Sequence, residues 1–287
     1  MRYCDLHCAT LTKIERLDDL DDRSENLQLS RKDLTAGVFL QTFAVFAENE
    51  RAKMQYFFQK KELFQSVKRE LTGVKCLLSV ENGAFLCDGE LEENVSRMAD
   101  CGVKILTLVW NGGNLLGGGH ETPNVGLTPL GFSAAELLGK SGIFTDVSHL
   151  SERGFFDLVQ KKFSARPLIA THSNARALCP HSRNLSDAQI KAIADGGGVI
   201  GVTFYPVFLG AASPAKHIRY LIDCGGEEVA AIGSDFDGMK KAYYPNGGVA
   251  ARGLYEDLKK EGLTERQIDK IFQKNVLRLF EETYPAG

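Results

Sequence analysis

The 287-residue chain is 44% hydrophobic and 25% charged, with a formal net charge of −3. This composition is that of a globular protein. It lacks the excess of Lys and Arg that binding to a polyanion requires, so nucleic acid is not expected as a partner. No run of about 18 apolar residues and no basic-then-apolar leader appears, so we expect no membrane partner and a cytoplasmic location. The seven cysteines form no CxxC pair and predict reduced thiols.

Strand-like and helix-like segments alternate along the whole chain, which is typical of parallel α/β proteins. Strands are predicted at residues 2–8, 38–46, 75–81, 103–110, 143–149, 167–172, 198–205 and 229–235. Helices are predicted between them, with capped starts at Thr128, Ser186 and Thr264. Eight strand–helix units favour one (β/α)8 TIM barrel domain over residues 1–287, of the metal-dependent hydrolase type, rather than an open doubly wound sheet.

Side chains of metal-ligand type end five of the eight predicted strands. They are His7, Glu81, His149, His172 and Asp235. The carboxyl ends of barrel strands form the catalytic face, and unpaired polar groups buried together there would cost several kcal/mol. Imidazole and carboxylate ligands suit Zn²⁺ or another divalent transition metal, which lowers the pKa of bound water from about 15.7 towards 7. The pattern therefore predicts a metal-dependent hydrolase in which Asp235 orients water and transfers its proton.

The remaining basic side chains give weaker signals. His217 lies in a helix outside the barrel and is expected at the surface. His120 lies in the glycine-rich segment 111–120, which is predicted to be a mobile loop over the barrel mouth, where the histidine can reach a substrate. Arg183 follows the sixth strand, and its guanidinium either holds a substrate carboxylate through two hydrogen bonds or forms an ordinary loop salt bridge.

Several motifs in order resemble the membrane dipeptidase (renal dipeptidase) family, peptidase family M19 of the amidohydrolase superfamily. They read DLHC, SVENG, LTLVWN, DVSHLS, THSNARALCPHSRN and GSDFDG, and the chain closes with NVLRLFEE. The resemblance implies a (β/α)8 barrel with two zinc ions, which hydrolyses dipeptides that often carry a D-residue at the C-terminal position. It also implies Asp235 as the catalytic aspartate and Arg183 as the residue that binds the substrate carboxylate.

The same resemblance assigns the metal ligands. Glu81 matches the carboxylate that bridges the two ions, His149 and His172 match ligands of one zinc, and His7 matches a ligand of the other. At the end of the fourth strand, where the animal enzymes carry a histidine, this chain has Trp110. We therefore place Trp110 among the substrate-binding residues.

The first motif departs from the family pattern His-x-Asp, in which both residues bind one zinc. Here the sequence is His7-Cys8-Ala9, within the segment YCDLHCATL. Side chains two apart in a strand share a face, so Asp5, His7 and Ala9 are expected together and Cys8 on the opposite side. We therefore expect one well-held ion at Glu81, His149 and His172, and a weak or absent second ion.

The leading prediction is a zinc-dependent dipeptidase with one or two Zn²⁺ ions, or other divalent transition metals, acting on small dipeptides. Enzymes of the family that the sequence resembles are often dimers, so a second copy of this chain, forming a homodimer, is considered as a partner. Because of Ala9, two alternatives stay open. One is a catalytically impaired relative kept for binding or regulation, and the other is a mononuclear hydrolase of another small amide, an N-acyl amino acid or a lactone.

Overall fold

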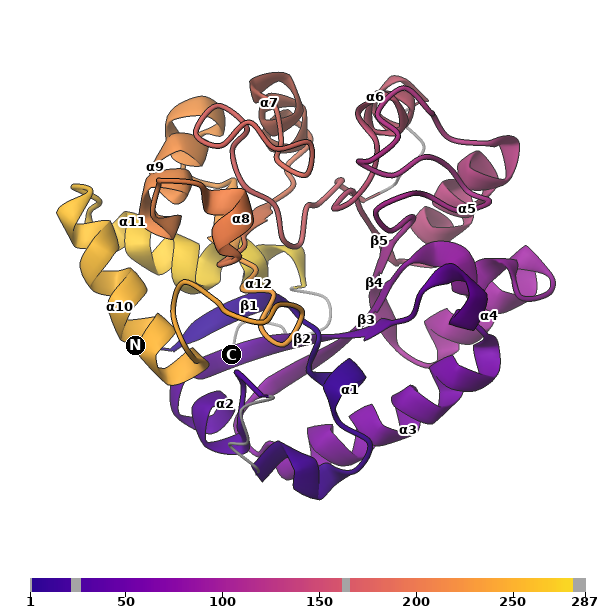
Figure 1. Ribbon diagram of the computed structural model, residues 1–287, viewed down its shortest axis with the longest axis horizontal. Coiled ribbons are helices and arrows are strands. Elements are labelled where there is room, and N and C mark those ends of the chain that lie inside the picture. Colours follow the sequence, from indigo (N-terminus) through magenta and orange to yellow (C-terminus); the bar gives the residue numbers. More distant parts are fainter. Residues whose placement is uncertain (1, 22–26, 162–165, 281–287) are drawn as a thin grey trace.

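Parallel strands occur at seven of the eight predicted places in the computed structural model, which describes residues 2–21, 27–161 and 166–280. The strands are β1 (Tyr3–Cys8), β2 (Val38–Phe46), β3 (Lys75–Glu81), β4 (Val103–Thr107), β5 (Phe144–Asp146), β6 (Ile200–Val202) and β7 (Ala230–Ile232). They form one sheet in the order β5-β4-β3-β2-β1-β7-β6, with every pairing parallel. The sheet curls around a central axis with helices outside it (Figure 1).

The predicted strand at 167–172 is reduced to a two-residue bridge between the edge strands. Ile169 pairs in parallel with Asp146 of β5, and Ala170 pairs with Ile200 of β6. The segment is short because Pro167 has no N–H to donate and the Thr171 N–H donates to the Asp146 side chain (2.9 Å) instead of a neighbouring strand. The bridge fills the eighth barrel position, and the (β/α)8 fold class is confirmed.

Four other strands end earlier than predicted. The strands predicted to end at residues 110, 149, 205 and 235 end instead at Thr107, Asp146, Val202 and Ile232. The backbone explains two of these early ends. His149 has φ 67° and Asp235 has φ 61°, and a β-strand does not accommodate a positive φ. The candidate ligands His149 and Asp235 therefore lie in tight turns just beyond their strands.

The helices surround the sheet, and α3 and α4 cover the outer face of β2 to β4 (Figure 1). They are α1 (Thr10–Lys13), α2 (Arg31–Gly37), α3 (Met54–Glu70), α4 (Leu91–Asp100), α5 (Pro129–Lys140), α6 (Glu152–Lys161), α7 (Asp187–Asp195), α8 (Pro206–Leu209), α9 (Pro214–Gly225), α10 (Gly247–Lys260), α11 (Glu265–Asp269) and α12 (Asn275–Leu279). The predicted caps are confirmed, since Thr128, Ser186 and Thr264 each accept a hydrogen bond from the backbone N–H three residues on.

An apolar cluster fills the floor of the barrel. Each strand position contributes to it, and α12 closes it from below with Val276 and Leu279. In β1 the contributors are Cys4 and Leu6, whereas Cys8 packs in the outer core, because the register shifts between Asp5 and Cys8. The strict alternation predicted for this strand is therefore wrong. The irregularity lets the His7 side chain, near the carboxyl end, enter the barrel mouth.

Candidate active site

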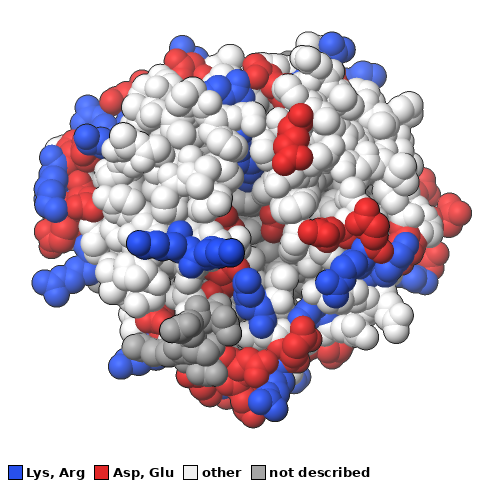
Figure 2. All heavy atoms as spheres, in the orientation of Figure 1, with Lys and Arg blue, Asp and Glu red and all other residues white. Residues whose placement is uncertain are grey.

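A cavity of about 340 Å³ opens at the carboxyl ends of the strands. Glu81, His149, His172 and Asp235 line it, and His7 lies buried beside them with 1% of its surface exposed. Figure 2 shows this face of the molecule hollowed near its centre, with acidic and basic side chains around the hollow. The structure therefore brings together all five side chains that the sequence placed at strand ends.

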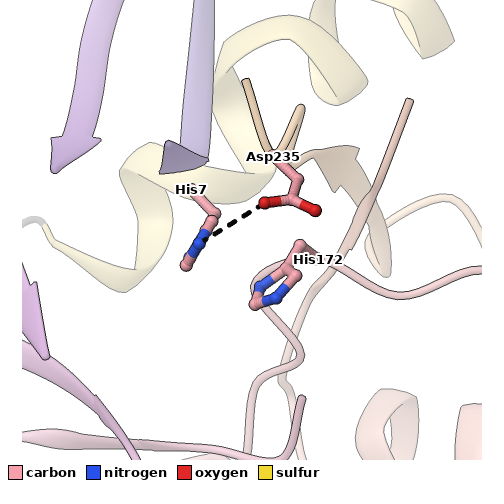
Figure 3. Close-up of side chains that lie close together, drawn as sticks. All are labelled: His7, His172 and Asp235. Atoms are coloured by element: carbon pink, nitrogen blue, oxygen red, sulfur yellow. Dashed lines mark ion pairs between the residues drawn. The ribbon is translucent and has the colours of Figure 1, made fainter. Parts of the chain in front are cut away.

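The Glu81 carboxylate lies between the imidazoles. Its Oε1 is 3.0 Å from His149 Nε2 and 3.7 Å from His172 Nε2, and its Oε2 is 3.4 Å from His7 Nε2. Asp235 Oδ1 lies 3.8 Å from His7 Nε2, and Figure 3 shows His7, His172 and Asp235 pointing toward one another. Two groups can hold a metal ion, and in each the donor atoms lie within 4.8 Å of one another: Glu81, His149 and His172, and His7, His172 and Asp235.

The outer nitrogens of two histidines are fixed by neighbours. His149 Nδ1–H donates to the Asn111 side-chain oxygen (2.8 Å), and His172 Nδ1–H donates to the Thr171 hydroxyl (2.8 Å). Thr171 is the acceptor there because its own proton is donated to Asp146 Oδ2 (2.6 Å). These tautomers, assigned from the hydrogen bonds, leave both Nε2 lone pairs pointing into the site.

The free nitrogens fit a cation. His149 Nε2 and His172 Nε2 are 2.9 Å apart, so their lone pairs repel each other unless a positive charge lies against both. His7 Nε2 is buried and has no hydrogen-bond partner among the described residues. This nitrogen requires a proton or a cation against it, and imidazole with carboxylate is the donor set that zinc and related divalent ions prefer.

Burial and charge shift the pKa values of these groups in opposite directions. Burial alone would lower the pKa of His7, but the adjacent Glu81 carboxylate outweighs it and raises the pKa to about 9. Burial lowers the pKa of His149 to about 4 and raises that of Asp235 to about 7. Burial opposes ionisation of Glu81, yet His7 and His149 hold its pKa below the usual range. The Glu81 carboxylate and the His7 ring therefore stabilise each other's charge, whereas burial keeps the His149 ring neutral.

Strained backbone surrounds the same cavity. Asn82, His149, Asp235 and Asp237 are the non-glycine residues of the described chain with positive φ, at 85°, 67°, 61° and 68°. Each follows the carboxyl end of β3, β5 or β7. Such conformations cost on the order of 1–3 kcal/mol each and persist where the surroundings fix them, which is characteristic of functional sites.

Of the two predicted substrate-binding residues, Trp110 lies at the surface of the cavity and Arg183 is buried behind it. Trp110 lines the cavity, with its ring 5.0 Å from that of Phe46. Arg183 is 3% exposed and lies behind His172, where Nη2 donates to the His172 carbonyl and Nη1 to the Ser173 hydroxyl, each at 2.9 Å. Its Nε has no partner, and no carboxylate of the described chain lies within ion-pair distance. The loop salt bridge considered for Arg183 is therefore absent among these residues.

Ala9 and its neighbours leave the His7 side of the site short of one ligand. Ala9 lines the cavity at the start of α1, and Cys8 is buried in the outer core. Thr10 does not replace the ligand, because its hydroxyl donates to Asp237 Oδ2 (2.6 Å). Among the described residues, the carboxylates within 4 Å of His7 Nε2 are those of Glu81 and Asp235, whereas the Asp5 carboxylate accepts from the His7 backbone N–H (3.2 Å).

Two histidines lie elsewhere than expected. His217 is fully buried on the inner side of α9, where it accepts from the Ala175 N–H (3.1 Å) and donates to the Leu209 carbonyl (3.1 Å), so its predicted surface position is wrong. His120 is 9% exposed and is not among the residues that line the cavity. Its Nε2–H donates to the Asn111 oxygen (3.0 Å) and its Nδ1 accepts from the Ser182 hydroxyl (2.9 Å).

The glycine-rich segment 111–120 is packed closely against its own start. A Cβ at Gly119 would fall 2.0 Å from the Asn111 carbonyl oxygen, so only glycine permits this approach. The His120 N–H donates to the His149 carbonyl (2.8 Å), which ties the end of the segment to the site. The sequence analysis missed this role of the loop and assigned none to Asn111, Asp146 or Thr171. Each lies in a motif quoted above, but a motif does not show which histidine such a side chain will contact.

Asn111 supplies the first testable prediction. Replacing Asn111 with leucine removes the acceptor that fixes the His149 tautomer, so we expect metal affinity to fall by about 10- to 100-fold. Titration of the metal-free protein with zinc measures this. Asn111→Asp keeps an acceptor oxygen and is expected to stay close to the wild type. An unchanged dissociation constant in the leucine variant would show that Asn111 does not position His149.

A parallel (β/α)8 barrel with imidazoles and carboxylates at its carboxyl end is the architecture of a metal-dependent hydrolase. The chain belongs to the membrane dipeptidase family, peptidase family M19, whose family model matches residues 8–286. The resemblance seen in the sequence is thereby confirmed.

Two curated relatives are similar over much of the chain. An uncharacterized protein in the pqqA 5′ region of Klebsiella pneumoniae is 35% identical over 219 residues, which are 70% of this chain and 80% of that protein. An uncharacterized dipeptidase of Schizosaccharomyces pombe is 30% identical over 202 residues, which are 63% of this chain. The match spans 47% of the length of the yeast protein.

Solved structures share the fold. A metallopeptidase of family M19 named dipeptidase AC superposes with a TM-score of 0.86 at 23% identity, covering 100% of this chain and 99% of that one. A metallopeptidase from Rhodobacter sphaeroides, liganded with a phosphinate mimic of the dipeptide L-Ala-D-Ala, has a TM-score of 0.86 at 22% identity and covers 99% of both chains.

Proposed function

We propose that this chain is a metal-dependent dipeptidase that hydrolyses the amide bond of small dipeptides, including those with a C-terminal D-residue. The observation that carries the proposal is the Glu81 carboxylate, which presents one oxygen to His149 and His172 and the other to His7. The family membership and the dipeptide mimic bound by the Rhodobacter sphaeroides metallopeptidase support the substrate class.

Each side chain has a stated part in the reaction. Glu81, His149 and His172 would hold zinc or another divalent transition metal. His7, beside the second Glu81 oxygen, would contribute to a second ion. When bound, the metal supplies a water nucleophile that is active at neutral pH. Asp235 lines the cavity with 14% of its side chain exposed, and its carboxylate would take up a proton from the attacking water and donate it to the nitrogen of the departing amine.

The substrate ends are held by the groups around the metal site. Arg183 lies behind His172 and does not itself line the cavity, but it is a buried cation without a carboxylate partner in the described chain. We assign to it the free carboxylate of the dipeptide. Trp110 and Phe46 form an aromatic wall that excludes water from the scissile bond. The single-domain organisation, the homodimer and the cytoplasmic location stay predictions. No helix in residues 2–21, 27–161 and 166–280 is both long and apolar enough to cross a membrane.

The test of the proposed function joins metal analysis of purified protein with hydrolysis of a small L-Xaa-D-Xaa panel. We expect about one tightly held ion per chain, because the His7 side has a methyl group where a ligand carboxylate fits. Ala9→Asp is then expected to raise the bound metal towards two equivalents and to increase turnover. Two equivalents in the wild type would contradict the weak second site.

Ala9 also favours a second candidate, a catalytically impaired relative that binds a small peptide without cleaving it. This candidate predicts one equivalent of metal and no turnover, together with saturable dipeptide binding. Hydrolysis of any peptide in the panel by the wild-type protein excludes it.

A further inference from the structure

The single helical turn α1 presents three residues to the catalytic cavity. Ala9, at its N-cap, and Thr12 and Lys13, in the turn itself, all line the cavity that holds Glu81 and His172. Residues three and four positions apart lie on one face of a helix, so Ala9 and the pair Thr12 and Lys13 are neighbours there. This turn therefore forms one wall of the site.

Among the described residues, the polar groups of this wall have no hydrogen-bond or ion-pair partner at bonding distance. Lys13 is exposed, and no carboxylate in the part of the chain that the structure describes lies within ion-pair distance of its ammonium. The Thr12 hydroxyl oxygen is buried and has no hydrogen-bond partner among the described residues. Both residues line the cavity, and an ammonium together with a hydroxyl that lacks a partner suits an anionic group.

The neighbouring carboxylates are already engaged. Asp237 lines the same cavity, but it is 1% exposed, and its oxygens accept from the Thr10 hydroxyl (2.6 Å) and the Gln28 N–H (2.5 Å). Glu81 and Asp235 face the imidazoles. The Ala9 methyl, in the same wall of the cavity, adds no charge and leaves room beside the Lys13 side chain.

We propose that Thr12 and Lys13 form a subsite for an acidic side chain of the dipeptide, so that Lys13 determines specificity for aspartyl or glutamyl substrates. This inference rests on the proposed dipeptidase function and names its substrate class. The Lys13 ammonium donates to the side-chain carboxylate and the Thr12 hydroxyl donates to its second oxygen. The free carboxylate at the end of the dipeptide still binds at Arg183.

The experiment compares kcat/KM within matched peptide pairs, using the full chain loaded with zinc. The pairs are L-Ala-D-Glu with L-Ala-D-Gln, and L-Glu-D-Ala with L-Gln-D-Ala, which differ only in charge and hydrogen bonding. We expect the acidic member of at least one pair to be preferred by about tenfold, the effect of one charge-assisted hydrogen bond at a partly solvated site. Lys13→Met is expected to reduce that ratio to about one.

Lys32→Met is the matched control. Lys32 is an exposed lysine on α2 that does not line the cavity, so this variant should keep the wild-type ratio. A ratio taken within one enzyme is independent of its folded fraction and metal content. Hydrolysis of the neutral peptides without an acidic preference, or a preference that persists in Lys13→Met, overturns the subsite alone. If none of the four peptides is hydrolysed, the proposed function is overturned and the subsite with it.

Discussion

Glu81→Gln is expected to strip the purified protein of most of its metal and to lower kcat/KM by at least about 10³-fold. Among the described residues, Glu81 is the carboxylate whose oxygens reach His149, His172 and His7, at 3.0, 3.7 and 3.4 Å. Glutamine keeps the shape but loses the negative charge, and its NH2 group would turn a donor toward ring nitrogens or a cation. Metal content and dipeptide hydrolysis, measured on the same preparation, test this.

The matched control for this variant is Glu152→Gln on α6. Glu152 forms an ion pair with Arg176 (2.6 Å) with 42% of its side chain exposed, and it does not line the catalytic cavity. Its loss is expected to leave metal content and activity near those of the wild type, because exposed ion pairs contribute at most about 1 kcal/mol to stability. Unchanged metal content in Glu81→Gln would mean that the metal site has been assigned to the wrong residues.

The sequence was most informative at the strand ends. Parallel strands in a barrel all end at one face, so the order of the chain alone placed His7, Glu81, His149, His172 and Asp235 near one another. Each of these residues is of a type that ligates metals, and each follows an apolar strand whose period is visible. Residue type and strand position together thus predicted which side chains meet, without any knowledge of their distances.

Features that depend on contacts between distant segments could not be predicted in this way. The strand predicted at 167–172 is shorter than expected because the Thr171 N–H donates to the Asp146 carboxylate. His217 is buried because its ring nitrogens bond to the backbones of Ala175 and Leu209. Asn111 is an ordinary polar residue in the sequence, and its role comes from lying within hydrogen-bond distance of both His120 and His149. Such partners are defined by the tertiary fold rather than by local pattern.

Asp235→Asn is expected to lower kcat by about 10²- to 10⁴-fold while metal content stays near that of the wild type. Asparagine fits the same space but cannot take up a proton, so it removes the proton transfer and little else. The backbone holds the residue in place independently of the carboxylate, since the Asp235 N–H donates to the His7 carbonyl (3.1 Å) and Asp235 accepts from the Gly238 N–H (3.1 Å). The turn should therefore survive the substitution.

The metal content of this variant separates two roles for Asp235. Its Oδ1 lies 3.8 Å from His7 Nε2, in a group that can itself hold an ion, so the carboxylate is placed either to carry a proton or to serve as a ligand where Ala9 offers none. A proton carrier predicts full metal content with low kcat, and Asp235→Glu, which keeps a carboxylate, should recover part of the rate. A ligand predicts that Asp235→Asn loses metal in proportion to activity, and that result would move Asp235 from proton transfer to metal binding.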